Sequence, residues 1–137
     1  MRGAYNQLYL HFVWGTWHRE ALITPELQPH LYASIAHHSV ELGADVIAIG
    51  GMPDHVHLLV RFPTTISASE FMRRVKGGSS HLVTQVMCWP EPFKWQGGYG
   101  VFSVSKRNLP AAKAYVLNQE RHHADGAVHA ALERMTG

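Results

Sequence analysis

The sequence predicts an α+β fold, in which four strands form one antiparallel sheet and two helices cover one of its faces. The order of the patterned segments supports this prediction, because strand, helix, strand, strand, helix and strand follow one another and a further helix ends the chain. Two adjacent strand-like segments are joined by a turn rich in glycine and proline, as in a β-hairpin. The length of 137 residues is that of about one domain, so we expect residues 1–137 to form a single domain.

The first half of the chain predicts a strand, a helix and the hairpin. Between residues 5 and 14, large apolar residues at even positions alternate with mostly polar ones at odd positions, the two-residue period of a half-buried strand. Thr24 followed by Pro25 marks the start of a helix, and apolar residues at helical spacing continue to Gly43. Residues 44–51 and 55–62 then read as the two strands of the hairpin.

The second half predicts a helix, a strand and a last helix. Residues 67–86 carry a helical apolar stripe, in which Gly77 and Gly78 predict a bend. A loop with two prolines and several glycines leads to an alternating strand at 99–105, and the last helix spans about 110–124. The βαββαβ order is that of ferredoxin-like folds, and the additional C-terminal helix is available to cover the other face of the sheet.

Composition excludes several classes of protein. Hydrophobic residues make up 46% of the chain and charged residues 16%, which argues against disorder. The single cysteine, Cys88, forms no internal disulfide, and there is neither a secretion signal nor a membrane-spanning stretch, so we expect a cytoplasmic protein without a membrane partner. The net charge of +2, with eleven histidines, permits an anionic partner without requiring one.

Histidines and one helical stripe are the candidates for chemistry. His55 and His57 occupy alternate positions of one strand and therefore share a face, where they either bind a metal or line a solvated surface. On the last helix, Tyr115 and Gln119 fall on one side together with His122, although Tyr115 by itself is as expected for a packed tyrosine. His11 is a further ligand, a phosphate contact or an ordinary histidine of the sheet.

A second group of residues has the chemistry to contact nucleic acid. The helix at 67–86 carries three cations and two hydroxyls that suit phosphate groups, although cations on a helix commonly form only a solvated face: Arg73, Arg74, Lys76, Ser79 and Ser80. Four aromatic residues are candidates for stacking on unpaired bases, with Arg19 and Arg61 to hold the backbone, although Trp14 is placed better in the core: Trp14, Trp17, Trp95 and Tyr99.

Three blocks of the sequence, "GGMPDHVHLLV", "FKWQGGYGVFSVS" and "AYVLNQERHH", resemble the single-tyrosine HUH transposases of small insertion sequences and their REP-associated tyrosine transposase relatives. The resemblance extends from about Leu8 to His123. It implies that Tyr115, on the last helix, is the nucleophile. It also implies a homodimer that acts on single-stranded DNA at a hairpin or element end.

The resemblance further implies a divalent metal bound by His55, His57 and Gln119. Two imidazoles and one amide suit Mg²⁺ or Mn²⁺, whereas Zn²⁺ would be expected to recruit His11 or His122 as well. The expected reaction joins Tyr115 to a 5′-phosphate and leaves a 3′-hydroxyl, so the strand can be rejoined without ATP. The alternative is a non-catalytic or domesticated nucleic-acid-binding module of the same fold, since a fold does not determine a function.

Overall fold

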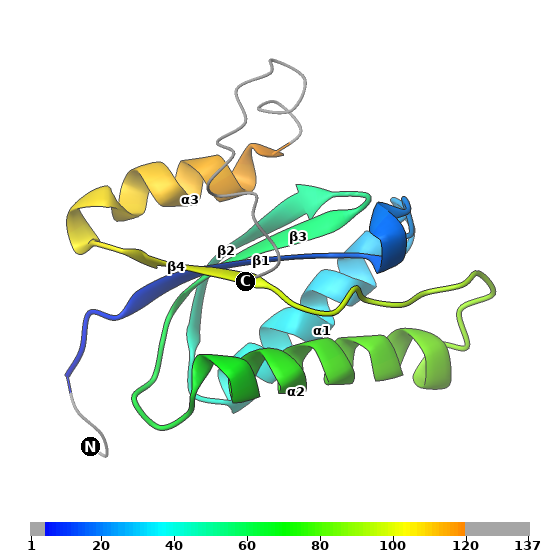
Figure 1. The fold of residues 1–137 in the computed structure, drawn as a ribbon, viewed down its shortest axis with the longest axis horizontal. Coiled ribbons are helices and arrows are strands. Elements are labelled where there is room, and N and C mark those ends of the chain that lie inside the picture. Colours follow the sequence, from blue (N-terminus) through cyan, green and yellow to red (C-terminus); the bar gives the residue numbers. More distant parts are fainter. Residues whose placement is uncertain (1–4, 120–137) are drawn as a thin grey trace.

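A four-stranded antiparallel sheet with the strand order β2-β3-β1-β4 forms the centre of the molecule (Figure 1). The computed structural model describes residues 5–119. The strands are β1 (Tyr9–Gly15), β2 (Asp45–Met52), β3 (His55–Arg61) and β4 (Gly100–Val104). β2 and β3 form the expected hairpin, and the order of strands and helices confirms the predicted α+β fold.

β1 is shorter than the alternation of residues predicted. The strand was expected from residue 5, but it begins at Tyr9, which pairs with Arg61 on β3 and with Val104 on β4. Both neighbouring strands end at these two residues. The residues before Tyr9 therefore alternate in polarity but lack a full set of hydrogen-bonding partners on the neighbouring strands.

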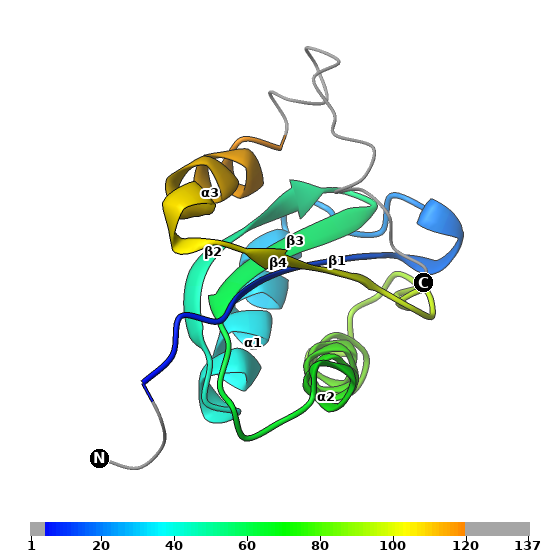
Figure 2. The same ribbon diagram turned by 60° about the vertical axis from the view of Figure 1, so that its left-hand side comes forward.

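Two helices, α1 (Gln28–Glu41) and α2 (Ala68–His81), cover one face of the sheet, and Figure 2 shows them on the same side. The even-numbered apolar residues of β1 and β3 face these helices. The resulting core contains fully buried side chains from all four elements, including Phe12, Trp14, Val56, Leu58, Leu31, Ile35, Phe71 and Val75. The alternation seen in the sequence thus gives the sheet one wholly apolar face.

The boundaries of these two helices differ from the prediction. α1 begins at Gln28, three residues after Pro25, although Thr24 does accept hydrogen bonds from the backbone N–H groups of Leu27 and Gln28. Pro29 has no N–H to donate to the Pro25 carbonyl, so the regular bonding begins late. The expected bend at Gly77 and Gly78 is wrong, because α2 is continuous through both residues.

Gly78 has a packing role instead. A methyl group there would collide with the His38 ring, so the glycine lets α1 and α2 approach closely. The irregularity of this segment lies further on, at Leu82–Val86, where a π-helical turn is marked by a bond from the Met87 N–H to the Leu82 carbonyl.

The third helix, α3 (Leu109–Leu117), covers the opposite face of the sheet (Figure 1). It packs on β2 and β3 through a small cluster formed by Ala48, Leu59 and Val116. The predicted helix 110–124 is observed up to Leu117 and is interrupted at Asn118, with φ −109° and ψ 35°. Residues after Gln119, including His122 and His123, lie outside the described part.

Within residues 5–119, no helix is both long and apolar enough to cross a membrane.

Candidate active site

The two histidines of β3 lie in a buried layer between the sheet and α3. His55 is 1% exposed and His57 is 0% exposed, so they do not line a solvated surface. Their ring centroids are 5.1 Å apart, with the ring planes at 74°. Alternation along β3 places both rings on the face that α3 covers, and one small ion can therefore be reached from both.

Tyr115 is brought over this pair by α3. Its ring centroid is 5.7 Å from that of His57 and 6.3 Å from that of His11, and the residue is 7% exposed. Gln119 follows one helical turn later and is 2% exposed. The structure therefore places Tyr115 against His57, with His55 beside His57 on the same strand and Gln119 buried one turn after Tyr115.

The Gln119 amide is oriented by the helix itself. Its Nε2 donates a hydrogen bond of 2.8 Å to the carbonyl oxygen of Tyr115. Its Oε1 is buried and, within the described residues, has no hydrogen-bond partner. A buried acceptor costs free energy unless it is satisfied, and a cation coordinated by Oε1 would satisfy it. An unsatisfied amide oxygen is thus a ligand that suits a hard divalent metal.

His11 lies on β1 directly behind His57. The distance between His11 Nε2 and His57 Nδ1 is 2.7 Å, and both residues are buried. When His57 Nδ1 donates this hydrogen bond, the lone pair is on Nε2, which then can act as a metal ligand. In this arrangement His11 orients the ring of His57. It lies behind that ring and not where a third metal ligand would lie.

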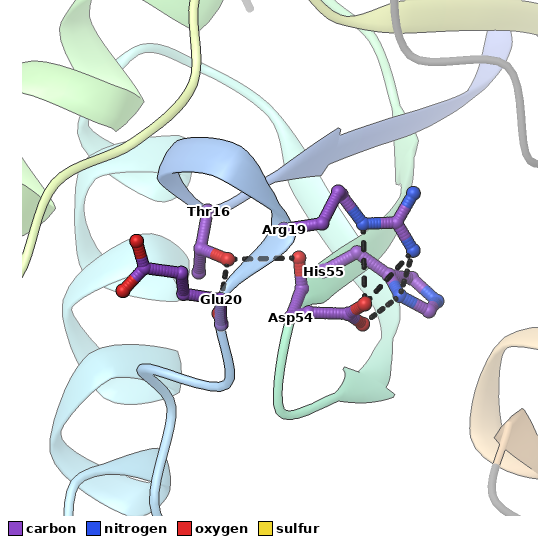
Figure 3. A network of polar contacts seen from close by, with 5 residues as sticks. All are labelled: Thr16, Arg19, Glu20, Asp54 and His55. Atoms are coloured by element: carbon purple, nitrogen blue, oxygen red, sulfur yellow. Dashed lines mark hydrogen bonds and ion pairs between the residues drawn. The ribbon is translucent and has the colours of Figure 1, made fainter.

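Asp54 has the corresponding position beside His55 (Figure 3). Its Oδ1 lies 2.7 Å from His55 Nδ1, while its Oδ2 lies 3.1 Å from Nη2 of Arg19. The carboxylate accepts from Nδ1, so the lone pair of His55 is on Nε2. The sequence signal for this residue was an acidic side chain directly before the first histidine, and it was missed.

Gly50 allows α3 to lie this close to the sheet. It pairs with His57 across β2 and β3, and a methyl group at Gly50 would collide with the backbone carbonyl of Val116. Val116 is the residue after Tyr115. The contact thus fixes the height of the tyrosine above the histidines, and it is a second feature that sequence reasoning did not identify.

Among residues 5–119, no three His, Cys, Asp or Glu side chains are arranged to hold a metal ion. The alternative ligand His122 lies outside the described residues.

The residues expected to contact phosphate differ in their burial and hydrogen bonds. Lys76 is half-buried and donates from Nζ to the carbonyls of Gln96 and Gly98, and desolvation lowers its pKa. The hydroxyl of Ser79 is buried and bonded to Val75 and Trp95, so it is not available at the surface. Ser80 is half-buried.

The arginines of this group differ in their surroundings too. Arg73 is paired with Glu70, and the pair raises the pKa of Arg73 while lowering that of Glu70. Arg61 is paired with Asp45, and Arg74 is exposed on α2. Of the aromatic candidates, Trp14 and Trp95 are in the core, Tyr99 packs against it, and Trp17 is exposed.

Comparisons with known proteins show what this chain is similar to. Residues 4–119 match the family model described as "Transposase IS200 like". The ISDra2 transposase TnpA of Deinococcus radiodurans is 25% identical over 125 residues, which cover 86% of this chain and 88% of that protein.

Two solved structures share the fold. A crystal structure from Deinococcus radiodurans, of a protein named as a candidate transposase, has a TM-score of 0.69 and 25% identity and covers 87% of this chain and 95% of that one. A REP-associated tyrosine transposase bound to a REP hairpin has a TM-score of 0.67 and 15% identity and covers 90% and 72% of the two chains.

Proposed function

The chain belongs to the IS200-like transposase family, and from this premise we propose that it cleaves and rejoins single-stranded DNA through a covalent bond to Tyr115. The observation that carries the proposal is the position of Tyr115, whose ring lies 5.7 Å from that of His57, with His55 beside His57 and Gln119 one turn after the tyrosine. A phenol next to a potential metal ligand is an arrangement that supports nucleophilic attack on a phosphodiester.

We propose that His55 Nε2, His57 Nε2 and Gln119 Oε1 hold a divalent metal, Mg²⁺ or Mn²⁺. When bound, such an ion polarises a phosphodiester and offsets the charge that develops on the departing oxygen. Asp54 and His11 keep the lone pairs of the two imidazoles on Nε2. Tyr115 attacks the phosphorus in line, the bond to the 3′-oxygen breaks, and the products are a 5′-phosphotyrosine and a free 3′-hydroxyl.

The reaction conserves the energy of the phosphodiester in the bond to Tyr115. Attack by the 3′-hydroxyl of another DNA end reverses the first step and releases the tyrosine. Cleavage and strand transfer are therefore the same chemistry in two directions, and neither needs ATP. We further propose that the protein acts as a homodimer and that its substrate is a DNA hairpin or element end. Light scattering of the purified chain measures whether it is a dimer.

The test is formation of a covalent protein-DNA adduct. The full chain is incubated with Mg²⁺ or Mn²⁺ and with single-stranded oligonucleotides that tile the DNA flanking its own coding sequence. We expect a species that resists denaturing electrophoresis and whose DNA-linked peptide contains Tyr115. Binding to the oligonucleotides without any adduct would instead support the alternative of a non-catalytic or domesticated binding module.

Asp54 gives a prediction for the metal site. Asp54→Asn replaces the carboxylate beside His55 Nδ1 with a neutral amide of similar size, which is a weaker acceptor and can also present its NH₂ group to the ring. Loss of such an orienting group typically lowers metal affinity about 10- to 100-fold. We expect a loss of this size for Mn²⁺, measured by calorimetric titration.

Asp45→Asn is the matched control. Like Asp54, Asp45 is an aspartate of the hairpin that pairs with an arginine, but its partner is Arg61 and the pair lies at the end of the hairpin far from His55. We expect it to bind Mn²⁺ as the original chain does. Equal losses in both variants would show that the effect is one of hairpin stability and not of ligand orientation.

A further inference from the structure

Trp17 has an unusual position for a tryptophan of this protein. It is 37% exposed, whereas Trp14 and Trp95 are 0% and 7% exposed, and Trp89 is half-buried. It belongs to a short 3₁₀ turn, η1 (Trp17–Arg19), directly after β1, and Figure 1 shows this turn beside the end of the β2–β3 hairpin. Part of a large aromatic ring is therefore available to a partner at this end of the sheet.

A cation lies over the ring. Lys94 Nζ is 3.9 Å from the centroid of the Trp17 ring, and the lysine is itself exposed. An aromatic surface beside a positive charge is the combination with which proteins hold single-stranded nucleic acid, because the ring stacks on a base and the cation holds a phosphate.

The turn is held in one place by its backbone. The N–H of Trp17 donates to the carbonyl of Lys94 at 2.9 Å, and the N–H of Gln96 donates to the carbonyl of Gly15 at 2.9 Å. The N–H of His18 donates to Oε1 of Gln96 at 3.0 Å. Lys76, from α2, then fixes the carbonyl of Gln96 at 2.6 Å. The backbone of both segments is therefore fixed before DNA binds, which lowers the entropic cost of binding a flexible strand.

The same turn contains backbone strain. His18 and Arg19 have φ values of 53° and 55°, in the left-handed region that side chains disfavour. Strain of this kind concentrates at functional sites. The strained turn ends at Arg19, whose guanidinium reaches Asp54 and lies 3.3 Å from His55 Nδ1.

We propose that Trp17 and Lys94 form a binding surface for the unpaired DNA strand next to the scissile phosphate, with Trp17 stacked on one base and Lys94 on a phosphate. The inference rests on the proposed function, because that function places a phosphate at His55. Trp17 lies two residues before Arg19, whose guanidinium is 3.3 Å from His55 Nδ1, so the turn adjoins the proposed site. Lys94 leaves the ring when the base arrives and pairs with the backbone instead.

The test measures binding separately from cleavage. The full chain with Tyr115→Phe is titrated, by fluorescence anisotropy, into a labelled DNA hairpin with random-sequence single-stranded tails and into the same hairpin without tails. Adding Trp17→Ala should weaken binding to the tailed hairpin about 5- to 150-fold, the range for loss of one base stack, and leave the tailless hairpin unaffected. Trp17→Phe should retain most of the affinity.

Charge and stacking are distinguished by salt. Lys94→Gln should reduce the slope of log affinity against log salt by about 0.7, the value for one phosphate contact on a single strand, whereas Lys94→Arg should keep it. Tyr5→Ala is the control for an exposed ring elsewhere, since Tyr5 is 79% exposed and precedes the opposite end of β1.

An abasic scan of the tails completes the experiment. One abasic position should weaken binding of the parent protein and have no further effect on Trp17→Ala. Equal binding by Trp17→Ala and its parent would overturn the inference even if a Tyr115 adduct forms. If the preference for tails depends on Trp17 but the chain with Tyr115 intact forms no adduct, the binding surface is supported and the proposed reaction is refuted.

Discussion

Tyr115→Phe is expected to abolish the covalent adduct completely while the protein still binds single-stranded DNA. The substitution removes only the hydroxyl, so the ring contacts with His57 and His11, at 5.7 Å and 6.3 Å, are retained. Without the phenolic oxygen there is no atom on α3 that can form the phosphodiester to DNA. Denaturing electrophoresis measures the adduct, and anisotropy with the same oligonucleotide measures binding.

The control for this prediction is Tyr99→Phe, which removes a hydroxyl from a tyrosine that packs against the core on the other face of the sheet. We expect it to form the adduct at the rate of the original chain. Chelation of divalent metal by EDTA should suppress the adduct of both the control and the original chain, and Mn²⁺ should restore it. An adduct of undiminished yield in Tyr115→Phe would refute the assignment of the nucleophile.

Gly50→Ala is expected to reduce the rate of adduct formation by at least about 100-fold, although Gly50 has no side chain to take part in the chemistry. The added methyl group would collide with the Val116 carbonyl, and backbone atoms cannot rotate away as a side chain can. α3 must therefore rise from the sheet and carry Tyr115 and Gln119 with it. Displacement of reacting groups by about 1 Å commonly costs about 100-fold in rate.

Overpacking of this kind also destabilises a fold by about 1–3 kcal/mol, which thermal unfolding would detect. Gly77→Ala provides the matched control, because a methyl group at Gly77 meets no atom within 4 Å and alanine is favoured over glycine inside a helix. It should leave the rate unchanged and raise the unfolding temperature slightly. A Gly50→Ala enzyme with normal rate would show that α3 does not need its close approach.

Local patterns were sufficient for the fold. The alternation in β1 and β3 predicted which side chains enter the core, and the order of elements predicted the sheet and its helices. Boundaries were less well predicted, because they depend on partners distant in the chain. β1 begins where β3 and β4 supply hydrogen bonds, and α2 continues through Gly77 and Gly78 because His38 packs against the second glycine.

For the candidate site, the sequence by itself determined which residue types are available and their spacing along one strand and one helix. Periodicity placed His55 with His57 and Tyr115 with Gln119, and resemblance to a family suggested that the two pairs belong together. Only the tertiary structure decided that all four are buried, that Tyr115 lies against His57, that Asp54 and His11 lie within hydrogen-bond distance of the imidazoles, and that Gly50 sets the height of α3. These relations join β1, the hairpin and α3 across long stretches of chain, and local periodicity contains no information about such distances.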